Sequence, residues 1–501
     1  MQNRFILTIF CCLLLACQKP DEVIKEALVD YAYQPSTNPK IHQVENQLSG
    51  IIPIEGHKAW NIIDRMKHYR IPGVSIAVIH DFKIDWAQSY GYASIENRES
   101  LTEKTLFGAG SLSKFLTGLL ISKLAEEQKI ELNRAVNSYL TSWRIPNTIP
   151  RGDSISLEQL LSHTAGITIK EFNGYSADAT LPTLLQVLNG QQPANTPPIQ
   201  LKASPKGHYE FASGGYAIVQ QCLSDVFNMA FENLVNQQIV VPLKLTQTTF
   251  QQPVPIQFGK MAQGYAAEYQ HHSVIYPEQA AKGLWTTPTD FATIMAEVMK
   301  ALKGKKSIYK PSTAKRLMTP RAFNVVTGYQ KYNPNFWISD YGLGVATTRR
   351  QGKTSAQYFT HGGERKGFKS KMIGHLKNGY GAIVMVNAEQ SDEFIEEVLR
   401  AIATTYQWED YLPYSNIEKP TKFLLHGYYN VKKVSIAGSF NYWRQNELML
   451  TKGNEKWEID LPLPKGKYMY KFIIDDTWVL DPENQLTEID ENTENSLIEV
   501  K

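Results

Sequence analysis

A serine and a lysine three residues apart, Ser111 and Lys114, are the pair whose types and spacing could do covalent chemistry. A serine hydroxyl is a poor nucleophile at neutral pH and needs a neighbouring group that takes its proton. Apolar residues recur from Leu112 onward at helical spacing, which places both side chains on one helix face, a turn apart. A lysine that loses its charge through desolvation can then serve as the base.

The same pair has a purely structural interpretation. A serine at a helix start commonly caps the helix, and a lysine one turn later commonly lies on the surface. Because this short pattern also occurs by chance, the surrounding sequence has to decide between the two interpretations.

Four further motifs follow one another around this pair in a fixed order. They are Gly91–Glu99, Leu160–Gly166 (Leu-Leu-Ser-His-Thr-Ala-Gly), Gly283–Asp290 and His361-Gly-Gly363. In this order and at these separations they resemble the serine β-lactamase-related family, which includes class C β-lactamases, penicillin-binding proteins, D-amino-acid peptidases and esterases. The resemblance covers residues 45 to 411. It implies an α/β (α+β) fold, with an antiparallel sheet flanked by helices and a helical insertion.

The resemblance also assigns roles to single residues. Ser111 is the nucleophile, and Lys114 is the base or the partner of the base. The His361-Gly-Gly363 run takes the place of the family's third motif, on a strand beside the serine, where its glycines let a substrate lie close. The backbone N–H groups of Ser111 and Glu364 are the oxyanion donors. His361 either orients substrate or is a satisfied structural histidine.

The family's second motif departs from its usual sequence. Relatives carry a tyrosine that acts as a general base or proton relay, and the aligned position here holds Phe211 in Tyr209-Glu-Phe-Ala-Ser-Gly-Gly-Tyr216. A phenyl ring cannot transfer a proton, and losing a positioned acid–base group costs about 10²–10⁴-fold. Tyr209 lies on the same side of an extended segment, so it substitutes only if the backbone shifts, and otherwise it is a packing residue. Lys114 alone can still act, as in Ser-Lys dyads, so weak or narrowed activity, or none, is one outcome that the sequence leaves open.

Other patterns narrow the chemistry. A penicillinase-type Ser-Asp-Asn motif is absent, and Gly362 replaces the hydroxyl residue of true lactamases, which favours an esterase or peptidase. The adjacent His271 and His272 have no further ligand at metal spacing and are predicted to lie in an exposed loop. We therefore expect neither a metal nor a cofactor.

The N-terminus predicts the compartment. Residues 5–16 form an apolar run behind Arg4 that is too short to span a membrane and is typical of a signal peptide. It ends in Leu-Leu-Ala-Cys17, which resembles a bacterial lipobox and implies a lipid on Cys17; the alternative is an ordinary signal peptide with a chance cysteine. Residues 1–17 would be this signal and 18–47 a polar tether. The expected location is the bacterial cell envelope, at the outer membrane or periplasmic face, with membrane contact through the lipid alone.

The cysteine count and the net charge give no indication of a disulfide-bonded or a nucleic-acid-binding protein. Once Cys11 and Cys12 leave with the signal peptide and Cys17 is lipidated, only Cys222 remains, so no internal disulfide is possible. Cys222 lies on an apolar helical stripe and is expected in the core. A net charge of +3 with no basic run gives no indication of nucleic-acid binding.

Secondary-structure elements have to hold Ser111 and Lys114 in place, and the spacing of apolar residues along the chain predicts these elements. We predict helices over 57–69 and 395–406, a strand hairpin over 74–80 and 83–90, a mostly helical region over 111–303 and strands over 372–375 and 381–387. Together these form residues 48–411, the serine hydrolase domain.

After a linker over 412–422, short alternating strands at 431–437, 456–461, 467–474 and 497–500 predict a small β-sandwich of residues 423–501. Its runs Ala437–Trp443, Leu461–Phe472 and Asp475–Pro482 resemble the glycogen-binding carbohydrate module of the AMP-activated kinase β-subunit. The segment is expected to be a complete sandwich with its own aromatic core.

This second resemblance also implies a binding face. Trp443 and Trp478 would be stacking platforms for sugar rings, and Lys471, Thr493 and Asn495 would bond the hydroxyls of an α-glucan or other glycan. Alternatively, the tryptophans are core residues and the module only packs on the hydrolase domain.

Two functions follow from these patterns. The first is a lipid-anchored serine hydrolase that cleaves a small-molecule or peptide ester or amide through an acyl-Ser111 intermediate. The second is a protein that binds glycan or peptide without turnover, which Phe211 favours. The intact Ser111, Lys114 and third motif favour the first.

Overall fold

The computed structural model describes residues 33–52, 59–146, 154–202, 208–266, 273–325, 337–350, 353–408, 411–412, 417, 419–490 and 493–501. Cys17, the predicted signal peptide, residues 18–32 of the predicted tether and the His271–His272 pair lie outside these residues. Within them, no helix has the length and apolar character that a membrane crossing requires.

An eight-stranded antiparallel sheet forms the centre of the larger domain, in the order β3–β2–β1–β13–β12–β11–β10–β9. The strands are β1 (Gly73–His80), β2 (Lys83–Ser94), β3 (Glu99–Ser100), β9 (Trp337–Tyr341), β10 (Ala346–Arg350), β11 (Tyr358–Arg365), β12 (Phe368–His375) and β13 (Gly381–Val386). The predicted hairpin is the β1–β2 pair, and the two late apolar runs lie in β12 and β13, so these predictions are confirmed.

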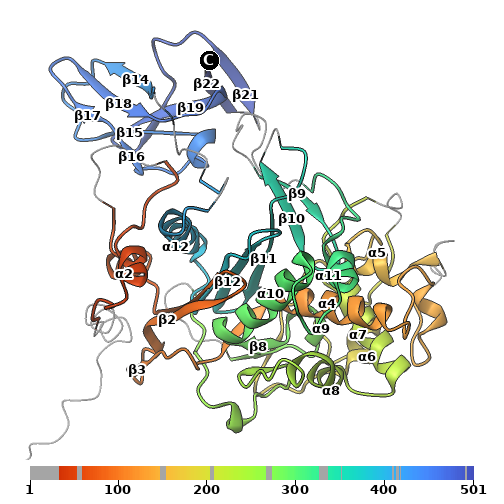
Figure 1. The fold of residues 1–501 in the computed structure, drawn as a ribbon. Coiled ribbons are helices and arrows are strands. Elements are labelled where there is room, and N and C mark those ends of the chain that lie inside the picture. The colour runs from red at the N-terminus through yellow and green to blue at the C-terminus, as the bar shows by residue number, and fades with distance from the viewer. Residues whose placement is uncertain are drawn as a thin grey trace, which may run out of the picture.

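Helices cover both faces of this sheet, as Figure 1 shows. One face carries α2 (Pro39–Glu45), α3 (Ile62–His68) and α12 (Asp392–Thr405), and the other carries α4 (Leu112–Glu126), α10 (Pro288–Lys303) and α11 (Pro311–Met318). Strand β1 sends side chains to both sides: Ile76 packs in the core beneath the first set of helices, and Ala77 and Ile79 pack in the core beneath the second. Because both faces are covered, β1 is a continuous apolar run. The predicted α+β fold class is confirmed.

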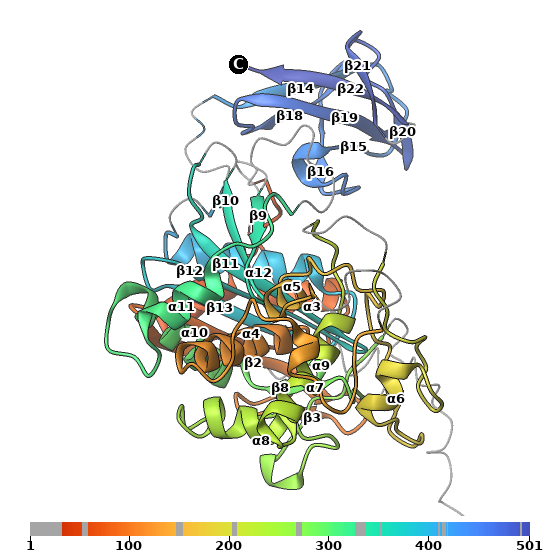
Figure 2. The ribbon, with the colours of Figure 1, turned by 90° about the vertical axis from the view of Figure 1, so that its right-hand side faces the viewer.

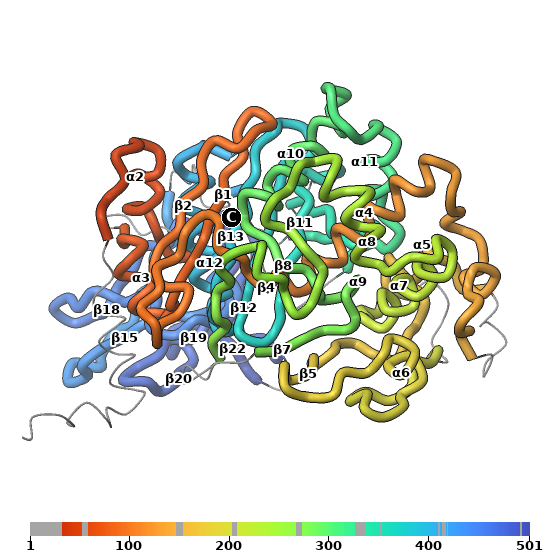
Figure 3. The backbone as a smooth tube through the Cα atoms, turned by 90° about the horizontal axis from the view of Figure 1, so that it is seen from below, coloured from red at the N-terminus to blue at the C-terminus, as the bar shows by residue number. Residues whose placement is uncertain are grey.

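The helical insertion lies between β4 and β9. It holds α5 (Leu157–Leu161), α6 (Leu184–Asn189), α7 (Gly214–Phe227), α8 (Phe231–Val235) and α9 (Gln279–Lys282), with short turns η1 (Val136–Ser138), η3 (Asn236–Val240) and η4 (Ile256–Phe258). Figure 3 places α5, α6 and α7 at the opposite end of the domain from α2 and α3. Cys222 on α7 is fully buried, as predicted, and burial raises the pKa of its thiol to about 12.

A small sheet joins the insertion to the main sheet. Its order is β4–β8–β6, with β4 (Phe107–Gly110), β8 (Leu284–Thr286) and β6 (Thr248–Thr249), while β5 (Tyr175–Ser176) pairs separately with β7 (Val274–Ile275). Strand β4 contacts β11 and β12 and runs directly into α4. The start of α4 is therefore held against the main sheet.

The C-terminal residues form two further sheets above the larger domain (Figure 2). One has the order β14–β18–β17, and the other has β16–β15–β19–β22–β21 with β20 paired to β19. The elements are β14 (Thr421–His426), β15 (Val434–Gly438), η6 (Ser439–Asn441), β16 (Leu448–Met449), β17 (Thr451–Lys452), β18 (Lys456–Leu461), β19 (Gly466–Ile474), β20 (Thr477–Val479), β21 (Thr487–Asp490) and β22 (Thr493–Val500). The predicted all-β sandwich is confirmed.

The N-terminal segment is folded where a tether was expected. Helix α2 begins within the predicted tether, and its Ile41 and Val44 are buried in the core that α12 shares. Ile51 and Ile52 pack in the core of the C-terminal sandwich, and Ile51 N donates to Glu447 Oε1 at 3.1 Å. The sandwich core is therefore not complete within residues 423–501. So short a helix and an isolated apolar pair show no periodicity that would have indicated either contact.

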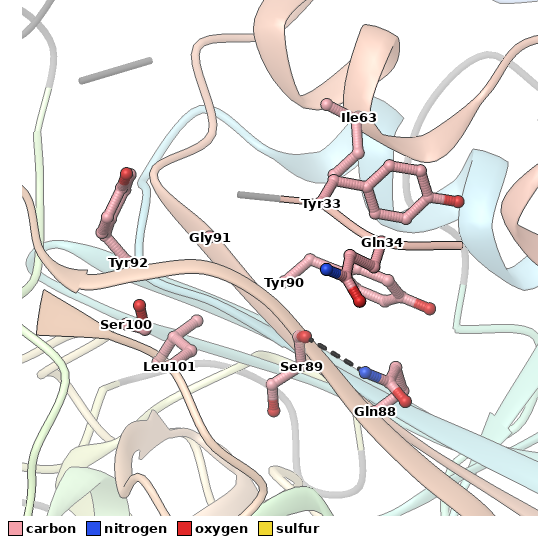
Figure 4. A pocket seen from close by; sticks show the side chains of 10 residues that line it. All are labelled: Tyr33, Gln34, Ile63, Gln88, Ser89, Tyr90, Gly91, Tyr92, Ser100 and Leu101. Carbon is pink, nitrogen blue, oxygen red and sulfur yellow. Dashed lines mark hydrogen bonds between the residues drawn. The ribbon is translucent and has the colours of Figure 1, made fainter. Parts of the chain in front are cut away.

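A cavity of about 310 Å³ lies where this segment crosses β2 (Figure 4). Tyr33 and Tyr90 line it from the two sides. Their hydroxyls donate to the buried Glu45 carboxylate at 2.9 Å and 3.0 Å. These bonds fasten the segment to the sheet.

Candidate functional site

The junction of β4 and α4 carries the Ser111 hydroxyl. Ser111 holds the N-cap position of α4, yet its side chain makes no capping hydrogen bond. Gly110 precedes it with φ 53°, a left-handed conformation that glycine adopts without strain. Ser113 fixes the turn, because its hydroxyl donates to Gly110 O at 2.6 Å and accepts from Leu284 N at 3.0 Å. The Ser111 hydroxyl is thus left for another partner.

That partner is Lys114, whose Nζ lies 2.8 Å from Ser111 Oγ and 3.2 Å from the Ala281 carbonyl oxygen. The lysine side chain is fully buried, so the alternative of a surface lysine is wrong. Burial lowers the pKa of Lys114 to about 7; the Glu171 carboxylate opposes this shift and the Lys282 charge adds to it. At neutral pH much of Lys114 is therefore a free amine, whose lone pair can accept the serine proton.

Strand β11 carries the third motif, His361-Gly-Gly363, beside the junction of β4 and α4. Successive residues of this motif lie on opposite faces of the strand. His361 and Gly363 are buried, whereas Gly362 and Glu364 are exposed. A Cβ at Gly363 would collide with the Ala109 carbonyl oxygen, so this glycine permits β11 to pack on β4. A Cβ at Gly362 would meet one backbone oxygen at 4.0 Å and nothing nearer. This corrects the expected role of Gly363, since Gly362 is the glycine that faces open space.

The backbone of Glu364 lies against the residue before the serine. A Cβ on Gly110 would stand 2.8 Å from Glu364 N, so only glycine permits this approach. The Glu364 side chain is 66% exposed and pairs with Lys369 at 2.9 Å. The two N–H groups expected to bind an oxyanion, those of Ser111 and Glu364, therefore belong to neighbouring segments, and their role stays a prediction.

His361 turns inward from β11. Its Nδ1 lies 2.6 Å from Gly362 O and its Nε2 lies 3.0 Å from the Tyr341 hydroxyl. Because a carbonyl only accepts, Nδ1 carries the proton and Nε2 accepts from Tyr341. Burial, reinforced by the charge of Lys114, lowers the pKa of His361 to about 4, so the ring is neutral at pH 7. These contacts favour the alternative of a satisfied structural histidine.

Phe211, and not Tyr209, lies beside Lys114 of the Ser111–Lys114 pair. The Nζ of Lys114 is 5.1 Å from the centre of the Phe211 ring. The Tyr209 ring packs on those of Tyr341 and His163, with centroids 5.5 Å and 5.9 Å away, and burial raises the pKa of Tyr209 to about 12. Tyr209 therefore stays protonated at neutral pH and is placed as a packing residue.

Two residues of this cluster were missed from the sequence, Tyr341 and His163. His163 Nδ1 accepts from Ala212 N at 3.1 Å, and its buried Nε2 has no hydrogen-bond partner among the described residues. Tyr341 precedes Gly-Leu-Gly344, and a Cβ on Gly344 would stand 3.0 Å from the Tyr216 hydroxyl. Gly342 and Gly344, on either side of Leu343, indicate that another segment packs closely here. Glycines alone do not identify that segment, so the sequence did not predict the contact.

The predicted sugar-binding residues of the C-terminal module share one face of its larger sheet. Tyr470 and Phe472 of β19 point into the core, so Lys471 points outward. Trp478 pairs with Ile473, two residues further along the same face. The Trp443 and Trp478 rings have centroids 6.1 Å apart and planes at 54°, and Trp478 is 37% exposed. Neither tryptophan is a core residue of the sandwich.

Thr493 and Asn495 on β22 complete this face, but they differ in exposure. Thr493 is exposed, whereas Asn495 is only 4% exposed. The Asn495 amide donates to Thr493 O at 3.0 Å and contacts Met469 Sδ at 4.0 Å. The Asn495 amide nitrogen is thus engaged within the module, and a bond from Asn495 to a sugar stays a prediction.

Family comparisons agree with this geometry. The family described as Beta-lactamase matches residues 60–407, which is more than half of the chain. The chain belongs to the β-lactamase family. A second family, described as the glycogen recognition site of AMP-activated protein kinase, matches residues 420–501. Both predicted resemblances are confirmed.

Two of the curated relatives are proteins of Staphylococcus aureus. "Protein flp" (strain COL) is 23% identical over 337 residues, 67% of this chain and 63% of that protein. "Teichoic acid D-alanine hydrolase" is 27% identical over 242 residues, 47% of this chain and 56% of that protein. The chain thus spans about three fifths of their length.

One solved structure of similar fold is the octameric penicillin-binding protein homologue from Pyrococcus abyssi. It aligns with a TM-score of 0.60 at 17% identity and covers 88% of this chain and 95% of that chain. This likeness supports the β-lactamase-family fold.

In this β-lactamase-family chain, Lys114→Met should raise the free energy of unfolding in a pH-dependent way. The lysine titrates near 10.5 when unfolded and near 7 when folded, so between these values the unfolded state holds more protons. Burial of the charged Lys114 therefore lowers the free energy of unfolding by its full amount below pH 7. This loss of stability disappears as the pH rises toward 10.5. At its largest it is on the order of 5 kcal/mol. Urea unfolding at about pH 6 and about pH 10 measures it; a pH-independent difference would contradict the shift.

Proposed function

We propose that the chain is a serine hydrolase that cleaves an ester or amide through an acyl-Ser111 intermediate. The observation that carries this proposal is the contact of 2.8 Å between Lys114 Nζ and Ser111 Oγ. The buried lysine has a pKa near 7, so a base is available where the nucleophile needs one.

The acylation step uses the neutral lysine. Lys114 takes the proton of Ser111 while Oγ attacks the carbonyl carbon of the substrate, and the N–H groups of Ser111 and Glu364 bond the developing oxyanion. The Lys114 ammonium then gives its proton to the departing alcohol or amine as the bond to the carbonyl carbon breaks. The product of this step is an acyl ester on Ser111 and a free leaving group.

Deacylation repeats the same proton transfers with water. Lys114 takes a proton from water while the water oxygen attacks the acyl carbon, and the lysine returns this proton to Ser111 Oγ as the acyl C–Oγ bond breaks and the carboxylic acid leaves. Phe211 supplies no acid–base group, so one lysine serves both steps. We therefore expect slow turnover compared with relatives that keep the tyrosine.

The second candidate function is binding without turnover, which Phe211 favours. The two candidates differ in one measurement, the release of product from an activated ester such as p-nitrophenyl acetate. We expect turnover that exceeds opening of the β-lactam nitrocefin, because Gly362 and the missing Ser-Asp-Asn motif favour an esterase or peptidase. Because a relative is named for hydrolysis of D-alanine from teichoic acid, D-alanyl esters are the first natural-type substrates to assay. Binding of these esters without product release would favour the second candidate.

We further propose that the module binds an α-glucan through Trp443 and Trp478. Stacking on flat rings is the main attraction that a protein offers a neutral sugar. In the full chain, Trp443→Ala with Trp478→Ala should weaken retention on glycogen by about tenfold or more, with the fold kept because the rings lie on the surface. Affinity electrophoresis in glycogen measures this effect.

The control for this prediction is Ile489→Ala. Ile489 is 70% exposed on β21 and pairs with Glu494, so it lies on the opposite face from Thr493 and Asn495. It should leave retention unchanged. Unchanged retention in the double tryptophan variant would place the glycan surface elsewhere. The full chain is used because Ile51 and Ile52 complete the module core.

A lipid on Cys17 is the proposed anchor, supported by the apolar run and the Leu-Leu-Ala-Cys17 sequence. It would hold the hydrolase at the bacterial cell envelope. Expressed in a bacterium, Cys17→Ser should lose incorporated labelled fatty acid and move from the detergent phase to the aqueous phase. Detergent-phase partitioning that persists in this variant would contradict the anchor.

A further inference from the structure

A second buried lysine, Lys282, lies at the end of α9. It directly follows Ala281, whose carbonyl oxygen accepts from Lys114 Nζ at 3.2 Å. Helix α9 packs on both α4 and α7, and Figures 2 and 3 show it beside α7. The acylation and deacylation steps make no use of Lys282, so its burial next to the Lys114 acceptor has another reason.

Glu171 is the counter-ion of Lys282. Its Oε2 lies 2.7 Å from Lys282 Nζ, and among the described residues no other carboxylate pairs with this lysine. Glu278, the residue before α9, is fully buried, but neither of its carboxylate oxygens has a hydrogen-bond partner in the described part of the chain. Burial raises the pKa of Glu278 to about 7, so this carboxyl is partly protonated at neutral pH. Glu171 therefore balances the Lys282 charge.

Glu171 also bonds the segment on the other side of Lys114. The same Oε2 accepts from the Ser213 hydroxyl at 3.3 Å. Beside this contact, Ser213 N donates to Lys170 O at 2.8 Å. Ser213 comes two residues after Phe211, whose ring centre lies 5.1 Å from Lys114 Nζ. Glu171 thus joins the end of α9 to the start of α7, the two segments that contact Lys114 Nζ beyond its own helix.

Glu171 and Lys282 are also the charges that act on Lys114. Burial is the main cause of the lowered pKa of Lys114, the Lys282 charge adds to it, and the Glu171 carboxylate opposes it. The other titratable side chains around Lys114 are neutral at pH 7, because burial lowers the pKa of each histidine and raises the pKa of each tyrosine: His163, His361, Tyr209, Tyr216 and Tyr341.

We propose that Glu171 and Lys282 are positioning residues of the Ser111–Lys114 pair. Their ion pair ties α9 to the start of α7, and this tie keeps the Ala281 carbonyl oxygen on Lys114 Nζ. Without Glu171, the buried charge of Lys282 has no counter-ion, so the end of α9 is expected to shift. This inference rests on the proposed function, in which Lys114 is the base.

The rate of labelling by a fluorophosphonate, followed against pH, tests this role. Glu171→Gln should label about tenfold more slowly at about pH 9, because Lys114 is less well held. Its pH midpoint should fall by about half a pH unit, since a half-exposed carboxylate that favours the ammonium is gone. Lys282→Met should move the midpoint upward by at least as much, because a buried positive charge is gone. Glu171→Asp, which keeps the charge, should keep the wild-type midpoint.

The matched control is Glu126→Gln. Glu126 also pairs with a cation, Arg316, at 3.2 Å, but it lies at the far end of α4 from Ser111. Its loss should leave both the labelling rate and the midpoint as in wild type. A loss of buried packing alone would slow labelling without moving the midpoints of Glu171→Gln and Lys282→Met in opposite directions.

A second readout does not depend on activity. The difference in the free energy of unfolding between each protein and its Lys114→Met version, followed against pH, reports the same midpoints. Wild-type protein that takes no label would contradict the proposed function, and the unfolding midpoints would then decide the positioning role. Unchanged midpoints, or shifts of Glu171→Gln and Lys282→Met in the same direction, would overturn it. If Lys282→Met fails to fold, the downward shift of Glu171→Gln and its absence in Glu171→Asp decide.

Discussion

Ser111→Ala should abolish hydrolysis of an activated ester, with a fall in kcat/KM of about 10⁴- to 10⁶-fold. The reason is that no other side chain among the described residues of the site meets the demands on a nucleophile. The Ser111 hydroxyl makes no capping bond and lies 2.8 Å from a buried lysine amine, whereas the Ser113 hydroxyl is committed to Gly110 and Leu284. Initial rates on p-nitrophenyl acetate at saturating and limiting substrate measure this loss.

A matched control is Ser122→Ala on the same helix. Ser122 is buried, and its hydroxyl has no hydrogen-bond partner among the described residues, so its removal alters packing alone. It should keep wild-type kcat/KM. Full turnover in Ser111→Ala would place the nucleophile on another residue.

Phe211→Tyr should raise turnover, with a ceiling of about 10²–10⁴-fold. The Phe211 ring lies 5.1 Å from Lys114 Nζ, so the added hydroxyl enters the region where the proton moves between serine and leaving group. The His163 ring lies 4.5 Å from the same ring and has a buried Nε2 without a partner among the described residues, so a polar group there gains a neighbour that can bond it. Steady-state rates on the same ester give the factor.

The paired control for this gain is Tyr209→Phe. Tyr209→Phe keeps the ring that packs on Tyr341 and His163 and removes only the hydroxyl, so it should leave kcat within a few-fold. If Tyr209→Phe removed activity while Phe211→Tyr changed nothing, the alignment that puts Phe211 at the tyrosine position would be wrong.

Local sequence patterns predicted the central pair and the strands around it. Ser111 and Lys114 lie one helical turn apart, so their contact follows from helix geometry once α4 forms. The β1–β2 hairpin and helix α12 were likewise evident from the spacing of apolar residues. The resemblance to the glycogen-binding module placed the two tryptophans on the surface, and the structure agrees, since neither belongs to the sandwich core.

Contacts between distant segments were not predictable in this way. Nothing near Ile51 indicates that it completes a sandwich formed some 400 residues later, and nothing near His361 names Tyr341 as its partner. The two glycines of the third motif differ only in which face of β11 they occupy, which depends on register against β4.

The most direct test of the central claim is the intact mass of the protein after incubation with a fluorophosphonate. Wild-type protein should gain the mass of one adduct, which peptide mapping assigns to Ser111, and labelling should accelerate as pH rises through about 7, where Lys114 becomes neutral. Ser111→Ala should gain no adduct. An adduct of equal amount on Ser111→Ala, or an unlabelled wild type above pH 7, would contradict an activated Ser111.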